Sequence, residues 1–224
     1  MMFRAFLASA LLAGLASAPS VASASAFESD RSRMLGDYLS GSYARYLNDP
    51  RAQSRYFQDA FGLAPDDTRL GRMALYSALF SGDPELARET AQRLYREDRT
   101  EAMARAVLAV DAFSKGRSAR VRKYASEPTQ DVTMGLAMQV LLGWTQVDEG
   151  QYERARETFS GMTQSAYFSA LGQLQIAKLE ARLGNREAAE AAFDRVEATG
   201  IAPLEYGLSR ARFEARTDRT DAAK

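Results

Sequence analysis

Polar and apolar positions along this chain follow the period of an α-helix. In residues 85–97, Leu86, Thr90 and Leu94 recur every four residues on one side, and charged side chains occupy the other side. This is the pattern of a helix that buries one face. Residues 103–113 form a more strongly apolar segment. The pattern in these segments predicts helices and not strands, because a half-buried strand would alternate with a period of two.

Residues that favour a left-handed backbone recur at a constant spacing of 34. Glycine adopts this conformation at little cost, and Asn and Asp tolerate it better than other residues do. A period of 34 is typical of helix-turn-helix repeats, in which each unit buries its apolar face only against its neighbours. The residues in register, each predicted to form a turn between two helices, are Asn48, Gly82, Gly116, Gly150, Gly184 and Asp218.

Two further sets of positions keep the same register. Seven residues before each turn residue, the side chains are mostly small, as a close crossing of two helices requires: Gly41, Leu75, Ala109, Gly143, Ala177 and Ala211. Nine residues after the turn come Phe57, Ala91, Ala125, Phe159 and Phe193. We expect the large members of this second set to fill the space that the small residues leave open.

This combination of small residue, turn glycine, alanine and aromatic resembles the tetratricopeptide repeat (TPR). The resemblance covers residues 34–224 and is strongest in 82–94, 150–162 and 184–196. The repeats are degenerate, because the closing proline is clear only at Pro65 and the aromatic of the first helix is mostly missing. The resemblance implies an all-α, right-handed superhelical solenoid of stacked helical hairpins.

The spacing of 34 residues also predicts where each repeat begins and ends. After a polar lead-in at 27–33, the repeats span 34–67, 68–101, 102–135, 136–169 and 170–203, with a partial repeat or cap over 204–224. Pro128 disfavours helix at the residue before it, so the helix over 118–126 should be short. Gly200 should end the last helix of the fifth repeat, and Pro203 should open the next helix. The segment 204–224 is either a cap or the start of an unfinished repeat.

Residues 1–26 are predicted to be a cleaved export signal. An arginine precedes an apolar run over 5–18, and small residues suited to signal peptidase follow. We expect cleavage after Ala24 or Ala26. The apolar run is shorter than the roughly 20 residues that a membrane-spanning helix needs. Because the chain has no cysteine, it is not a lipoprotein, and we expect a periplasmic or secreted protein without a stable membrane anchor.

The composition limits the kinds of partner, catalytic site and metal site that we expect. Lys+Arg and Asp+Glu each number 29, so no net field favours nucleic acid or an anionic membrane. Histidine and cysteine are absent, which removes imidazole bases, thiol nucleophiles and the usual zinc sites. No catalytic residue, cofactor or metal is expected. Most acidic residues belong to solvated faces of second helices, and a carbohydrate-active enzyme with a carboxylate pair stays as an alternative.

The TPR resemblance implies a binding surface on the concave side, lined by the first helix of each repeat. The corresponding residues are Tyr38, Arg45, Arg69, Arg72, Tyr76, Leu79, Val110, Phe113, Val140, Trp144 and Lys178. Aromatic and apolar side chains flanked by arginines suit a peptide with apolar anchors and a few acidic groups. The alternative is that these side chains pack into the core. The carboxylate clamp of the family is not expected, because Tyr38, Ser42, Arg72 and Tyr76 replace its lysines and asparagines.

The sequence therefore predicts a non-catalytic protein-interaction scaffold of the bacterial cell envelope. Its partner would be a protein or peptide bound on the concave face, and not a nucleic acid. An alternative is that the chain is the amino-terminal portion of a longer TPR protein, whose activity lies beyond residue 224.

Overall fold

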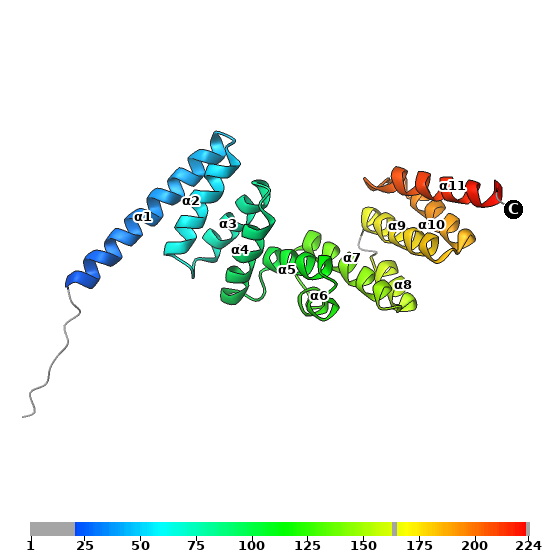
Figure 1. Cartoon of the computed structure of the whole chain (residues 1–224), viewed down its shortest axis with the longest axis horizontal. Helices are drawn as coiled ribbons and strands as arrows, with labels where there is room; N and C mark the ends of the chain where they lie inside the picture. The colour runs from blue at the N-terminus through cyan, green and yellow to red at the C-terminus, as the bar shows by residue number, and fades with distance from the viewer. Residues whose placement is uncertain (1–20, 163–164, 223–224) are drawn as a thin grey trace, which may run out of the picture.

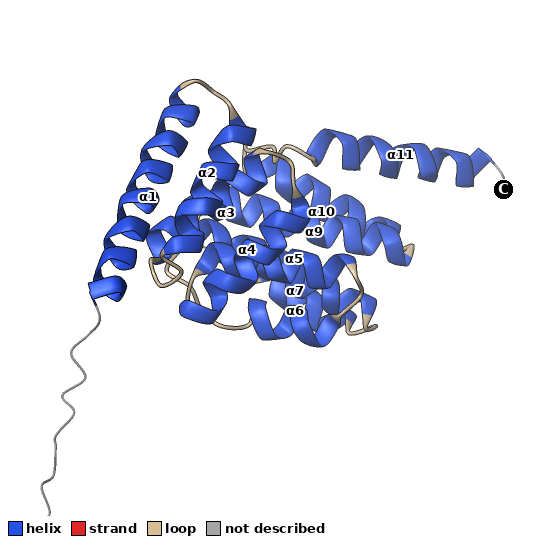
Figure 2. Ribbon diagram, turned by 60° about the vertical axis from the view of Figure 1, so that its left-hand side comes forward, coloured by secondary structure: helices blue, strands red, loops and turns tan. Residues whose placement is uncertain are grey.

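The chain folds into a row of helical hairpins stacked side by side (Figure 1). The computed structural model describes residues 21–162 and 165–222, and these residues form eleven α-helices and no strand. Short loops connect most of the helices (Figure 2). The helices are α1 (Val21–Tyr46), α2 (Pro50–Leu63), α3 (Thr68–Phe80), α4 (Pro84–Glu97), α5 (Ala102–Ser114), α6 (Ser118–Ala125), α7 (Val132–Asp148), α8 (Tyr152–Ser160), α9 (Ala166–Leu183), α10 (Arg186–Ala198) and α11 (Tyr206–Ala222). The predicted all-α class is confirmed.

The turn residues predicted from the spacing of 34 have a left-handed backbone at five of the six positions. Their φ angles are 57° at Asn48, 74° at Gly82, 63° at Gly116, 75° at Gly150 and 80° at Gly184. The sixth prediction, a turn at Asp218, is wrong, because α11 continues through this residue to Ala222. The segment after Gly207 contains neither glycine nor proline, so no residue there interrupts the helix.

The small residues of the first helices contact the large residues of the second helices, as predicted. A Cβ atom added at Gly41 would lie 2.8 Å from the ring of Phe57, and one added at Gly143 would lie 2.2 Å from the ring of Phe159. Both rings are almost fully buried. The missing side chain of glycine thus lets the two helices of a hairpin approach each other closely.

Successive hairpins bury their apolar surfaces against each other. Phe57 and Phe61 of α2 share a buried cluster with Leu70 and Ala74 of α3. The next second helix, α4, shares a cluster with α5 in the same way. The first helices α3, α5, α7, α9 and α11 each contact the next one in the series. The packing is that of a solenoid in which each unit depends on its neighbours.

Some helix boundaries differ from the predicted register. α7 begins at Val132 and α9 at Ala166, before the predicted boundaries at 136 and 170. Asp131 and Ser165 cap these helices through side-chain oxygens that accept backbone N–H groups. Pro203 does not open α11, because the helix begins at Tyr206 and the Pro203 carbonyl accepts the Tyr206 N–H.

The third hairpin is the irregular one, as the sequence predicted. α6 has eight residues and ends before Pro128. The following loop is held by Arg105 of α5, whose side chain is 1% exposed. Its guanidinium donates hydrogen bonds to the carbonyl oxygens of Tyr124, Glu127 and Pro128. A buried cation therefore satisfies backbone carbonyls that a longer helix would have paired internally.

The first helix begins before the first predicted repeat. α1 begins at Val21, so the predicted lead-in at 27–33 is part of the helix, and the predicted cleavage positions after Ala24 and Ala26 lie near its start. Residues 1–20 of the predicted export signal lie outside the described residues. Across the segments that the structure describes, no helix is both long and apolar enough to cross a membrane.

Candidate functional site

Three of the predicted groove residues form an exposed apolar surface on α3 and α5. The exposed fractions are 43% for Tyr76, 42% for Leu79 and 54% for Val110. Phe80, which the sequence analysis did not identify, adds a fourth side chain that is 75% exposed. Tyr76 and Val110 occupy equivalent positions, 34 residues apart, on the adjacent first helices α3 and α5. We call the four exposed side chains the apolar face.

The predicted arginines Arg45, Arg69 and Arg72 are all exposed. Arg72 lies close enough to Asp98 to influence its carboxyl group. The pKa of Asp98 lies below its ordinary value, chiefly because the Thr100 hydroxyl donates a hydrogen bond to it, and the positive charge of Arg72 contributes. These arginines therefore supply positive charge to the surface of α1 and α3.

Tyr38, Phe113 and Val140 are half-buried and support the packing interpretation more than the groove interpretation. The ring centroid of Tyr38 lies 6.2 Å from that of Phe57. Val140 packs against the buried cluster around Phe159. The structure thus places some of the predicted groove residues on an exposed surface and others in the interior.

Trp144 and Lys178 come together in a cavity at the carboxyl-terminal end of the solenoid. The Trp144 Nε1–H donates a hydrogen bond of 2.9 Å to the Gln175 side chain. The Lys178 ammonium lies 5.8 Å from the centre of the Trp144 ring, within the range of a cation–π contact. The cavity has a volume of about 550 Å³ and lies between α9 and α11, with the Trp144 side chain of α7 on its wall.

The walls of this cavity are basic and aromatic. Trp144, Phe193 and Phe213 supply the aromatic surface. The basic side chains are Lys178, Arg182, Arg186, Arg212 and Arg216, and no carboxylate is among the lining residues that the structure describes. We call this cavity the basic cavity.

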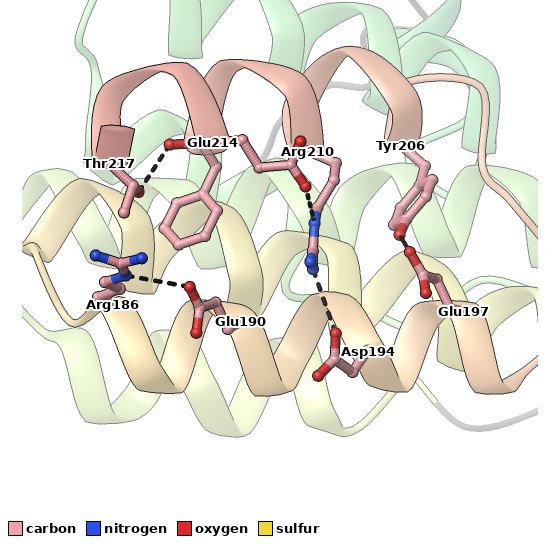
Figure 3. A network of polar contacts seen from close by, with 9 residues as sticks. Arg186, Glu190, Asp194, Glu197, Tyr206, Arg210, Glu214 and Thr217 are labelled. Atoms are coloured by element: carbon pink, nitrogen blue, oxygen red, sulfur yellow. Dashed lines mark hydrogen bonds and ion pairs between the residues drawn. The ribbon is translucent and has the colours of Figure 1, made fainter. Parts of the chain in front are cut away.

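Polar contacts hold α11 in the position that closes the basic cavity. Figure 3 shows Tyr206 and Arg210 of α11 pointing toward α10, where they bond to Glu197 and Asp194. The Arg210–Asp194 distance is 3.3 Å. Burial, together with the hydrogen bond to Glu197, raises the pKa of Tyr206 to about 12. Beneath these contacts, the rings of Phe193 and Phe213 lie 5.4 Å apart.

The sequence analysis missed four basic residues of this cavity. A signal for two of them was present, because Arg212 follows Lys178 by 34 residues and Arg216 follows Arg182 by the same spacing. The last segment was predicted to be a cap or a partial repeat, and no groove residue was assigned to it. Arg186 carried no such signal, since it opens the second helix α10.

Among the described residues, the carboxylates form no metal-binding group, and none of them lines the basic cavity. No group of three His, Cys, Asp or Glu side chains in these segments is placed to hold a metal ion. Glu85 and Glu153 on second helices form ion pairs with Arg88 and Arg156, one turn away, as expected of solvated helix faces. The basic cavity has no facing pair of carboxylates, which a two-carboxylate glycosidase would require.

Known proteins resemble this chain in structure but not in sequence. No family model matches the chain, and no curated protein matches it in sequence. Among solved structures, PilF of Pseudomonas aeruginosa matches with a TM-score of 0.58 and 15% sequence identity, over 87% of this chain and 89% of that chain. The likeness shows the fold alone, and it confirms that this chain is a TPR-like helical solenoid.

Proposed function

We propose that this protein is a non-catalytic scaffold of the bacterial cell envelope that holds protein segments on the concave face of the solenoid. The observation that carries the proposal is the apolar face, where Tyr76, Leu79, Phe80 and Val110 expose large side chains on two adjacent first helices. Single exposed apolar side chains are common, but several large ones exposed on two adjacent helices are typical of an interaction site.

A protein segment suits this surface better than a small substrate does. Tyrosine and arginine side chains contribute much of the energy of protein interfaces. Arg69 and Arg72 lie exposed on α3, which also carries Tyr76, and Arg45 lies exposed on α1. The helices are already formed and packed, so a docking segment would find an ordered surface, and little ordering of the scaffold would oppose binding.

The proposed location in the envelope depends on the predicted export signal. If signal peptidase cleaves after Ala24 or Ala26, the protein recovered from the periplasm begins at Ser25 or Phe27. Cell fractionation followed by amino-terminal sequencing tests this directly. Recovery of the uncleaved chain from the cytoplasm would contradict the envelope location.

Affinity capture from envelope extract tests the scaffold function. The mature protein and the double variant Tyr76→Ala, Val110→Ala are immobilised in parallel, with Tyr152→Ala as the matched control. Tyr152 is 39% exposed but lies on the second helix α8. We expect proteins captured by the wild type and the control to be lost from the double variant, with helical content unchanged. Equal capture by all three would refute binding at the apolar face.

A further inference from the structure

The basic cavity adds a second kind of surface to the concave side. We propose that this cavity binds an acidic segment of the partner protein, with carboxylates on its arginines and one apolar side chain against its aromatic wall. This inference rests on the proposed scaffold function and specifies the chemistry of the partner.

The charge of the cavity favours an acidic occupant. Five basic side chains line it without a carboxylate among the lining residues. Lys178, Arg182 and Arg186 pair with carboxylates outside the lining: with Glu205 at 2.8 Å, Asp148 at 3.5 Å and Glu190 at 3.1 Å, respectively. The pairs of Arg182 and Arg186 are largely exposed, so they neutralise the cavity only weakly.

Arg212 is the basic residue best placed to receive a ligand carboxylate. Its side chain is exposed, and among the described residues it makes no hydrogen bond or ion pair. Its charge acts at longer range on Glu205, whose pKa is lowered principally by the hydrogen bond from Lys178. An arginine fork can bind a carboxylate through two parallel hydrogen bonds. The cavity therefore offers an anchoring point for an acidic side chain.

The aromatic wall favours an apolar side chain next to the acidic ones. Trp144 is held in place by its hydrogen bond to Gln175, and Phe213 packs against the buried Phe193. A volume of about 550 Å³ holds a few side chains and not a whole folded domain. A short segment that combines carboxylates with an aromatic or aliphatic residue fits both walls at once.

The placement of the cavity favours a peptide over a lipid surface or a nucleic acid. The cavity is recessed between two helices, whereas a bilayer would need basic residues on an outer surface. A nucleic acid strand would need positive charge along its path, whereas Tyr76, Leu79 and Val110 expose apolar side chains on α3 and α5. A peptide needs only the local combination of basic and aromatic side chains that the cavity offers.

Selection from a random peptide library displayed on phage tests the inference, with peptides of about 12 residues. We expect peptides selected on the wild-type protein to be enriched in Asp or Glu together with Phe, Leu or Ile. Trp144 is the only tryptophan of the chain and lines the cavity. Synthetic tryptophan-free copies of the selected peptides should therefore change its fluorescence on binding.

Charge variants then locate the binding. Arg212→Glu should weaken the selected peptides by about tenfold or more, because it removes a charge-assisted contact and adds repulsion. Arg182→Glu gives a second, independent variant. Arg212→Lys should retain most of the affinity, and Arg120→Glu on the second helix α6 is the charge-matched control. Circular dichroism checks that each variant is folded.

Each outcome separates this inference from the scaffold proposal. The inference would be overturned if the selected peptides lacked acidic residues, or if they bound both glutamate variants as tightly as wild type. If the same peptides no longer bound the Tyr76→Ala, Val110→Ala variant, the scaffold proposal would still be supported. The inference would also be overturned if phosphatidylglycerol vesicles or single-stranded DNA bound the protein more tightly than every peptide and lost this binding in Arg212→Glu. A library that yields no enriched peptide would overturn the inference, and affinity capture from envelope extract would then decide the scaffold proposal by itself.

Discussion

The two ends of the concave face have the same backbone positions but opposite chemistry. Tyr76 of α3 lies 102 residues before Lys178 of α9, three repeats of 34, and Phe80 corresponds to Arg182 in the same way. The amino-terminal pair is exposed and apolar, whereas the carboxyl-terminal pair lines a basic cavity. The turn position keeps its left-handed backbone from Asn48 to Gly184, whereas these first-helix positions change from apolar to basic along the chain, and we infer that specificity lies in them.

Replacing Arg105, which holds the loop after α6, should have the largest effect on the stability of the fold. Arg105 of α5 is buried and bonds to three loop carbonyls. Arg105→Leu leaves these carbonyls without donors, so we expect a loss of about 3 kcal/mol in the free energy of unfolding, measured by urea denaturation. Arg120→Leu, an exposed control on α6, should change little. Equal unfolding midpoints for both variants would refute the structural role of Arg105.

A substitution at a packing position should destabilise the fold more than a substitution on the apolar face. Gly143→Ala places a Cβ 2.2 Å from the ring of Phe159, so the hairpin must open and we expect a loss of about 2 kcal/mol. Gly36→Ala is the matched control, because a Cβ at Gly36 meets nothing within 4 Å. Thermal unfolding compares the two variants. A Gly143→Ala protein as stable as wild type would mean that the close crossing of α7 and α8 is absent.

Acid should weaken the carboxyl-terminal half through one ion pair. Glu180 of α9, with a side chain 5% exposed, bonds to Arg156 of α8 at 2.5 Å. Its pKa lies below the ordinary 4.5, principally because Arg156 donates to it. The pair therefore stabilises the fold fully above the pKa of the unfolded chain, and this contribution is lost as pH falls through the lower folded pKa.

The Glu180→Gln variant tests this pH dependence. Its unfolding temperature should be lower than that of wild type near neutral pH, and the difference should shrink as pH falls from about 5 to about 3. Glu153→Gln is the control, because Glu153 also contacts Arg156 but is 85% exposed. A constant difference between Glu180→Gln and wild type across this range would show that the carboxylate does not contribute through its charge.

Changing a concave residue should have the smallest effect on stability. Val110 is 54% exposed on α5, so Val110→Ser should change the free energy of unfolding by no more than about 0.5 kcal/mol. Thermal denaturation measures this change. A loss of stability comparable to that of Gly143→Ala would show that Val110 packs in the core and does not belong to the apolar face.

The fold could be predicted from the sequence because its determinants are local and repeated. Turn glycines such as Gly82 and the crossing of Gly41 with Phe57 leave a signal at a fixed spacing. Asp218 failed as a turn because spacing alone does not break a helix. Arg105 gave no signal, since the loop carbonyls that it binds lie in a segment without a repeat pattern.

The candidate site was less predictable, because exposure depends on how the units stack. Tyr76 and Tyr38 come from equivalent stretches of first helices, yet one is exposed and the other packs against Phe57. The basic cavity needs α11 to lie against α9 and α10 through contacts such as Arg210 with Asp194. Pairing between helices of different repeats is not visible in the spacing of residues.

Site-specific photocrosslinking in cells tests the central claim most directly. Benzoylphenylalanine is placed at position 76 on the apolar face or at position 152 on the second helix α8, in place of two exposed tyrosines. The scaffold account predicts that irradiation joins a partner protein to the variant labelled at position 76 and not to the one labelled at 152. Crosslinks from position 152 alone, or from neither position, would contradict binding of a protein segment on the concave face.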